Sequence, residues 1–468
     1  MNQPWRRFFE EMRLLRREGV AAWALGGLLL LLVVAALNGR ALLAAQGAAS
    51  AELEIESATL VEALAAQSSR GVPAARDPGS VGFSVLTQPV ALPQAPLAPL
   101  AIGQGDLLPG RYELTARGAH QFLARTELDS PLRLAIGNFD AAFVIVWLLP
   151  LLAIGLCYGI VSAERERGVL ALAVAAGASP TRFVLGKWWS RVLLVIACVG
   201  IATLLAAAAG GALGRPGAGG QLAFWALIST LYALFWFALS LWLNAGPGSS
   251  ERNAMLLVGS WLAFVILAPA MTNLAATTMF AAPSRVNLTT ELREATEAAD
   301  QAAAAARDQY FFDHPEMQGA EMDTRAYFTS VARSEARIAL DMLPLLQAFD
   351  DQAARQQRLV ALLQYLSPGT LTYQALTTLA GSDGARHREF RAQTLRFHAD
   401  WTRFFVERLE AGRPLSPSDY AQLPRFAYVE APASETLRRV LLPLLVLTLA
   451  TAALYFAAVR RLRRLALV

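Results

Sequence analysis

Apolar residues are gathered into six long runs that carry almost no charge, and polar segments separate these runs. A helix that crosses the hydrocarbon core of a bilayer needs about 20 apolar residues, at a rise of about 1.5 Å each. The six runs reach that length, so the pattern predicts six transmembrane helices. Their predicted bounds are 20–37, 140–161, 188–213, 221–243, 255–274 and 440–459.

The first run permits two interpretations. Ala-rich sequence follows it, as it would after the core of a cleavable signal peptide. The run 20–37 has 18 residues, however, and the apolar core of a signal peptide usually has about 7–15. The length therefore favours an uncleaved membrane anchor.

Two long polar segments, 38–139 and 275–439, predict a second, mostly helical domain built from two insertions. The helix of the first run is expected to continue outward to about residue 66. Seven prolines then lie between Pro73 and Pro109. Such a density is expected to exclude helix and to favour extended or polyproline backbone.

Helices are expected in the second insertion over 292–310, over 325–365 and after Ser367-Pro368. Serine is a good N-cap and proline suits the first turn, while Gly381 is expected to end that third helix. The following helix carries an aromatic stripe at the spacing of a packed core. Its members are Phe390, Phe397, Trp401, Phe404 and Phe405.

Arginines indicate the direction of the spans. If the spans alternate, the clusters in 1–19, 162–187 and 460–468 fall on one side. Because cytoplasmic loops are enriched in Lys and Arg, both termini are expected in the cytoplasm and both insertions in the periplasm. Arg438 and Arg439 oppose this trend but are outnumbered. Residues 1–19 are expected to form an amphipathic helix on the bilayer surface, with a disordered basic tail as the alternative.

Composition supports a membrane protein. Of the 468 residues, 55% are hydrophobic and 17% are charged, against about 25% charged in soluble domains. The net charge of +4 does not indicate nucleic acid, because the arginines lie beside the predicted spans. Cys157 and Cys198 both lie inside apolar runs, so a disulfide in the polar domain is excluded.

The chain lacks the common signatures of an energy source. Transporters driven by ion gradients carry ionisable residues within their spans, and the cores of the six runs contain none. A phosphate-binding loop needs Gly, four residues and then Gly-Lys-Ser/Thr. Here Trp188 follows the Gly-Lys pair and Thr181 stands at the first Gly position. ATP is therefore expected to bind elsewhere than on this chain.

The histidines do not predict a metal site. His387 and His398 are the best-spaced pair, yet eleven helical residues separate them by about 16 Å. One metal ion cannot be shared over that distance. No catalytic, cofactor-binding or metal-binding residue is predicted.

The segment 162–187 carries the most specific motif. It contains the run Glu164-Arg165-Glu166-Arg167-Gly168-Val169-Leu170. An apolar stretch follows, then Ser179-Pro180, and then Lys187, which is the only lysine of the chain. The order predicts a short amphipathic helix on the cytoplasmic surface, a break, and a new helix that Ser179 caps. An ordinary charged loop is the alternative.

This order of residues resembles the signature of type-2 ABC exporter permeases, Glu-x-Glu-x-Gly-Thr-Leu followed by a Pro-containing turn and Gly-Lys. Val169 departs from it, because Thr or Ser is usual there, which puts any hydroxyl role at that position in doubt. Further motifs resemble a branch of these permeases that has a large periplasmic domain of unknown function. They are Leu366-Ser367-Pro368, Leu379-Ala380-Gly381, Arg388-Glu389-Phe390 and Leu423-Pro424-Arg425-Phe426-Ala427-Tyr428.

The resemblance covers nearly the whole chain and implies a permease subunit in a bacterial inner membrane. Such a subunit would form a dimer, with itself or with a sister permease, on two copies of an ABC ATPase that bind ATP and Mg. A further partner in the periplasm is compatible with the size of the domain there. The positions that would couple to the ATPase are Glu164, Glu166, Gly168, Leu170, Ser179 and Pro180.

Two other functions stay open. ATP hydrolysis could move the external domain, as in a mechanotransmission or maturation device, without passage of substrate through the membrane. The apolar spans and the external segments of about 260 residues favour this alternative to export. A membrane-anchored periplasmic enzyme or sensor is disfavoured, because the chain carries no familiar catalytic signature.

Overall fold

The computed structural model describes residues 11, 13, 19–103, 108–119, 122, 139–177, 179–280, six single residues between 290 and 301, and 324–465. These residues are mostly helical, and they include an antiparallel pair of short strands, β1 (Gln88–Ala91) and β2 (Arg111–Leu114). Six helices are long and apolar enough to cross a membrane. The predicted all-helical class with six membrane helices is thus confirmed.

Five of the six candidate spans begin before or end after the apolar run that predicted them, because hydropathy marks only the part that lies in hydrocarbon. Four of them are single uninterrupted helices, and the other two are interrupted by π-helical segments. They are α2 (Val20–Ser69); α7 (Ala141–Phe143), η3 (Val144–Leu148) and α8 (Leu149–Cys157); α11 (Pro180–Ala209); α12 (Ala218–Asn244); α13 (Ser250–Trp261), η4 (Leu262–Leu267) and α14 (Ala268–Met279); and α20 (Ala433–Leu465).

Each interrupted span has a proline just after its π-helical segment. In the second span, Pro150 removes one N–H donor from the helix, and the carbonyl of Val146 accepts the Tyr232 hydroxyl at 2.9 Å. In the fifth span the proline is Pro269, at the start of α14, and the carbonyl of Phe264 accepts the Ser367 hydroxyl at 2.5 Å. Both segments are therefore held by hydroxyl groups from other elements.

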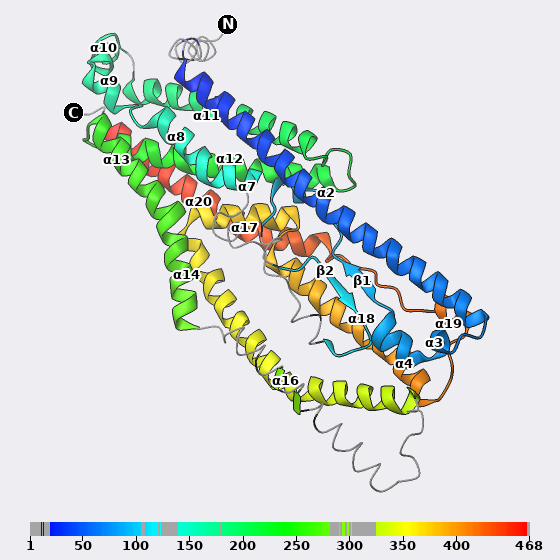
Figure 1. Cartoon of the computed structure of the whole chain (residues 1–468). Coiled ribbons are helices and arrows are strands. Elements are labelled where there is room, and N and C mark those ends of the chain that lie inside the picture. Colours follow the sequence, from blue (N-terminus) through cyan, green and yellow to red (C-terminus); the bar gives the residue numbers. More distant parts are fainter. Residues whose placement is uncertain are drawn as a thin grey trace.

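A second body, here called the distal domain, stands at one end of the bundle (Figure 1). It combines the outer half of α2 with the strand pair and further helices. These are α3 (Pro73–Arg76), α4 (Pro78–Ser80), η1 (Val81–Val85), η2 (Ala98–Leu100), α16 (Thr324–Leu363), η6 (Gln364–Leu366), α18 (Gly384–Glu410) and α19 (Pro417–Ala421). In Figure 1, α2 begins and α20 ends at the opposite end of the bundle.

The aromatic stripe of α18 lies in the core of the distal domain, as predicted. Phe390, Trp401 and Phe405 are buried. Trp401 and Phe405 belong to one apolar cluster with residues of α2, α3, η1 and α16, so the stripe joins both insertions into one core.

Helix α17 (Pro368–Ala380) connects the distal domain to the bundle. The Ser367 side chain caps it by accepting the N–H of Thr370 at 3.0 Å, and Gly381 ends it with a φ of 67°. Both predicted boundaries are confirmed. Leu376 and Leu379 belong to the same apolar core as the spans, so α17 anchors the domain on the bundle.

The proline-rich segment was expected to exclude helix, and this is wrong. One-turn helices begin at Pro73 and Pro78, where the missing N–H costs nothing because first-turn donors have no helical partner. The strand pair was not predicted. Helices expected over 1–19 and 292–310 fall mostly outside the described residues.

Candidate functional site

The segment between the second and third spans folds as two short helices, α9 (Ser162–Glu166) and α10 (Val169–Ala175). A single amphipathic helix was expected there. Gly168 breaks it, because its backbone is left-handed with a φ of 71°, a conformation that glycine adopts readily. The two helices lie at the end of the bundle where α2 begins and α20 ends (Figure 1).

Helix α10 presents apolar side chains to its surroundings. Leu172 is 72% exposed and Val174 is 47% exposed, and every side chain of α10 is at least partly exposed. Leu170 is partly buried and packs against the core of the bundle. One side of α10 is thus attached while the remainder is uncovered, which is typical of a surface that a partner covers.

Glu164 is held by the only lysine of the chain. Its carboxylate lies 2.8 Å from Nζ of Lys187 on α11, and both side chains are mostly buried. Glu11 lies 3.9 Å from the same Nζ and 2.9 Å from the guanidinium of Arg191. These paired charges fix α9 to the start of the third span.

Glu166 makes a separate connection, to the start of α13. It accepts the backbone N–H of Ser250 at 2.7 Å and also the Ser250 hydroxyl. The two predicted acidic residues therefore point to different helices, and α9 joins the third and fifth spans.

A buried polar network lies beneath α9. The Ser162 hydroxyl bonds Oδ1 of Asn244 at 3.0 Å, and Nδ2 of Asn253 donates to the same oxygen at 3.3 Å. Asn244 also donates to the carbonyl of Cys157 at 3.1 Å. Since buried amides cost free energy when unpaired, this network specifies how α9 sits on α12 and α13.

Arg165 adds a third attachment, to the loop between α12 and α13. Its guanidinium donates to the carbonyls of Gly246, at 3.3 Å, and Gly248. Ser162, Asn244 and Asn253 were not singled out from the sequence, although their position at the ends of apolar runs is a usable signal, and Arg165 was noted only within the motif and the arginine cluster.

Ser179 and Pro180 start α11, as predicted. Ser179 has the extended backbone of an N-cap, but its side chain makes no capping hydrogen bond to the described residues, which corrects the expected role of its hydroxyl. Pro180 suits this place because its ring fixes φ near the helical value. Both residues lie beyond α10 and outside the network around Glu164 and Glu166.

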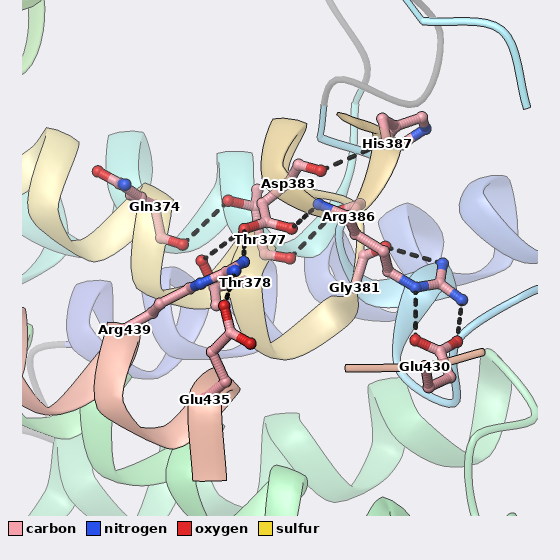
Figure 2. A network of polar contacts seen from close by, with 11 residues as sticks. Gln374, Thr377, Thr378, Gly381, Asp383, Arg386, His387, Glu430, Glu435 and Arg439 are labelled. Carbon is pink, nitrogen blue, oxygen red and sulfur yellow. Dashed lines mark hydrogen bonds and ion pairs between the residues drawn. The ribbon is translucent and has the colours of Figure 1, made fainter. Parts of the chain in front are cut away.

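A second polar cluster joins the distal domain to the last span (Figure 2). Arg386 of α18 forms a two-pronged contact with Glu430, and Arg439 of α20 contacts Glu435 and lies 3.8 Å from Asp383. This cluster therefore ties the α17–α18 turn to the segment that leads into α20.

Two comparisons with known proteins bear on these regions. A family model described as "Domain of unknown function (DUF3526)" matches residues 285–429, which cover all of α16, α17, α18 and α19 and the chain that follows as far as Val429. A search of curated proteins finds no match. The described part of the match includes α17 and helices of the distal domain, and the match does not include α9 and α10.

Proposed function

We propose that this chain is the permease subunit of an ABC transporter, and that α9 and α10 receive the movements of a separate ATPase. The observation that carries the proposal is the exposed apolar surface of α10 beside the fixed helix α9. A coupling element needs a face for the partner and a rigid attachment to the spans. Leu172 and Val174 provide the face, and the Glu164–Lys187 pair contributes to the attachment.

In this proposal, ATP and Mg bind to two copies of the ATPase, and a second permease copy or a sister permease completes the assembly. The chain itself is not an enzyme. The membrane is the bacterial inner membrane, both termini are cytoplasmic, and the distal domain is periplasmic.

The test is the amount of ATPase that co-purifies with the full chain from native membranes in mild detergent. Leu172→Asp places a charge on the exposed face of α10 and is expected to remove most of the ATPase and of the ATP hydrolysis. Ile55→Asp is the matched control, because Ile55 is 67% exposed but lies on the outer half of α2. Equal ATPase recovery with both variants would contradict the proposal, as would hydrolysis by the pure chain alone.

A second function, movement of the distal domain without passage of substrate, is favoured by the interior of the bundle. A cavity there has a volume of only about 10 Å³, room for one water molecule at most, and it is lined mainly by apolar side chains such as Leu32, Leu149 and Trp225. Transport assays in vesicles distinguish the two functions. ATP-dependent uptake of a solute supports export, whereas ATP-dependent change in the distal domain without uptake supports mechanical transmission.

A further inference from the structure

A large cleft lies where the distal domain meets the bundle. Its volume is about 1110 Å³, which exceeds the usual range of about 300–1,000 Å³ for small-molecule sites. The walls come from the start of α12, the α17–α18 turn, one face of α18, the first turns of α20 and residues 425–432. Residues 423–432 are here called the return segment, because they lead from α19 back to α20 (Figure 1).

The return segment presents an unpaired backbone edge. It has no regular secondary structure, and Val429 alone among its N–H groups has a hydrogen-bond partner in the described part of the chain. That partner is the Gln393 side chain, which also donates to the Val429 carbonyl at 2.8 Å. An edge of free N–H and C=O groups is a template for an added extended chain.

Contacts with α18 hold this edge in place. Phe426 packs against Phe390 and Phe397, with ring centroids 6.0 Å and 5.4 Å apart. Arg386 forms an ion pair with Glu430 and also donates a hydrogen bond to the Pro93 carbonyl at 2.7 Å. The edge is therefore fixed before a ligand arrives, which lowers the entropic cost of binding.

Among the described residues that line the cleft, one cation has no ion-pair partner. The carboxylates of the cleft are paired with arginines: Glu389 with Arg396, Asp400 with Arg403, and those of the polar cluster as in Figure 2. Arg425, which lines the cleft on the return segment, has no ion-pair partner among the described residues and is exposed. A ligand that carries a carboxylate complements it.

From this arrangement we infer that the cleft binds an extended peptide segment of a partner protein, with an acidic side chain placed at Arg425. The peptide backbone pairs with the free N–H and C=O groups of the return segment, and its side chains rest on the face of α18 that lines the cleft, which is mostly polar and includes Gln393 and Phe397. Lipid headgroups can pair with Arg425, but they supply no backbone N–H groups for the free carbonyls of the return segment. The inference goes beyond the proposed function and does not depend on the identity of the ATPase.

The experiment uses the full chain in nanodiscs and three pools of acetylated, amidated octapeptides, random except for a fixed central Asp, Asn or Lys. Retained peptides are quantified by mass spectrometry. We expect the Asp pool to be retained about tenfold better than the Asn pool, the ratio that one charge-assisted contact gives. Arg425→Gln should abolish that preference, whereas Arg413→Gln, which changes an exposed arginine outside the cleft, should not.

A second variant tests the backbone edge. Ala427→Pro removes an N–H that has no partner in the described structure, and it should weaken retention of all three pools while the unfolding midpoint stays unchanged. Failure of every pool to bind the parent chain would overturn the inference. So would retention that neither variant affects, or native mass spectra in which Arg425→Gln removes a bound phospholipid and no peptide competes with that lipid.

Discussion

The hydroxyl of Tyr232 donates to the carbonyl of Val146 at 2.9 Å, across from α12 to the second span. Val146 stands four residues before Pro150, so its carbonyl lies where the helix has lost a donor. In a membrane, a free backbone carbonyl has no water to bond, and a neighbouring helix must supply the donor. The contact thus makes the irregular second span compatible with hydrocarbon.

Tyr232→Phe is expected to destabilise the bundle, because it leaves the buried carbonyl of Val146 unpaired. The cost of such a group is about 1–3 kcal/mol. Unfolding of the purified chain by denaturant in detergent measures it. Tyr158→Phe is the control, since Tyr158 is 44% exposed and should change little. Equal stability of the two variants would show that another donor reaches Val146.

The Glu164–Lys187 pair is expected to behave as one unit. Lys187→Met leaves the mostly buried Glu164 without its ion-pair partner, and Glu164→Gln leaves Lys187 with only the more distant Glu11, so each should reduce stability and ATPase recovery. The double variant should lose less than the sum, with a coupling of about 1–2 kcal/mol. A double-mutant cycle of unfolding free energies measures this coupling, and strictly additive losses would show that the two groups act independently.

The orientation of the chain is tested by cysteine labelling in intact cells. Ser69→Cys and Ser330→Cys lie on exposed positions of the distal domain and should react with a membrane-impermeant thiol reagent. Ala176→Cys, just after α10, should be protected until the cells are opened. The parent is the unlabelled control, because Cys157 and Cys198 are buried. The reverse pattern would invert the topology.

His387 should make the stability of the distal domain depend on pH. Burial is the main cause that lowers the pKa of His387 below 6.5, with a smaller contribution from Arg386. Between the folded and unfolded pKa values, the unfolded chain binds more protons. The contribution of His387 to the free energy of unfolding is therefore fully present above about pH 6.5 and is lost as the pH falls through the folded pKa.

The measurement is the thermal unfolding midpoint of the full chain at about pH 7.5 and about pH 5.5, which bracket the ordinary titration of histidine. The parent should unfold at lower temperature in acid, and His387→Gln should show a smaller drop. An identical drop in both proteins would assign the effect to other groups.

Local features were predictable from the sequence because their causes are local. The cap at Ser367, the left-handed Gly381 and the stripe around Trp401 each depend on residues within one or two helical turns. The break at Gly168 was missed, since a glycine permits the left-handed backbone without requiring it.

Contacts between distant elements were not predictable. Glu164 and Lys187 are 23 residues apart, and Tyr232 and Val146 are 86 apart. Only the packing of the spans decides that these pairs meet. Arg386 reaches the carbonyl of Pro93 over 293 residues for the same reason.

The continuous helix α2 also fixes a distance. Its 50 residues span about 75 Å, of which a bilayer core covers about 30 Å. About 45 Å of the helix therefore stands clear of the hydrocarbon, and its tip is pinned to the distal domain where the Ser68 hydroxyl donates to the Leu415 carbonyl at 2.8 Å. A rigid helix of that length sets how far from the membrane a partner protein must extend to contact the outer end of the distal domain. A membrane-anchored partner with a shorter linker would not reach it.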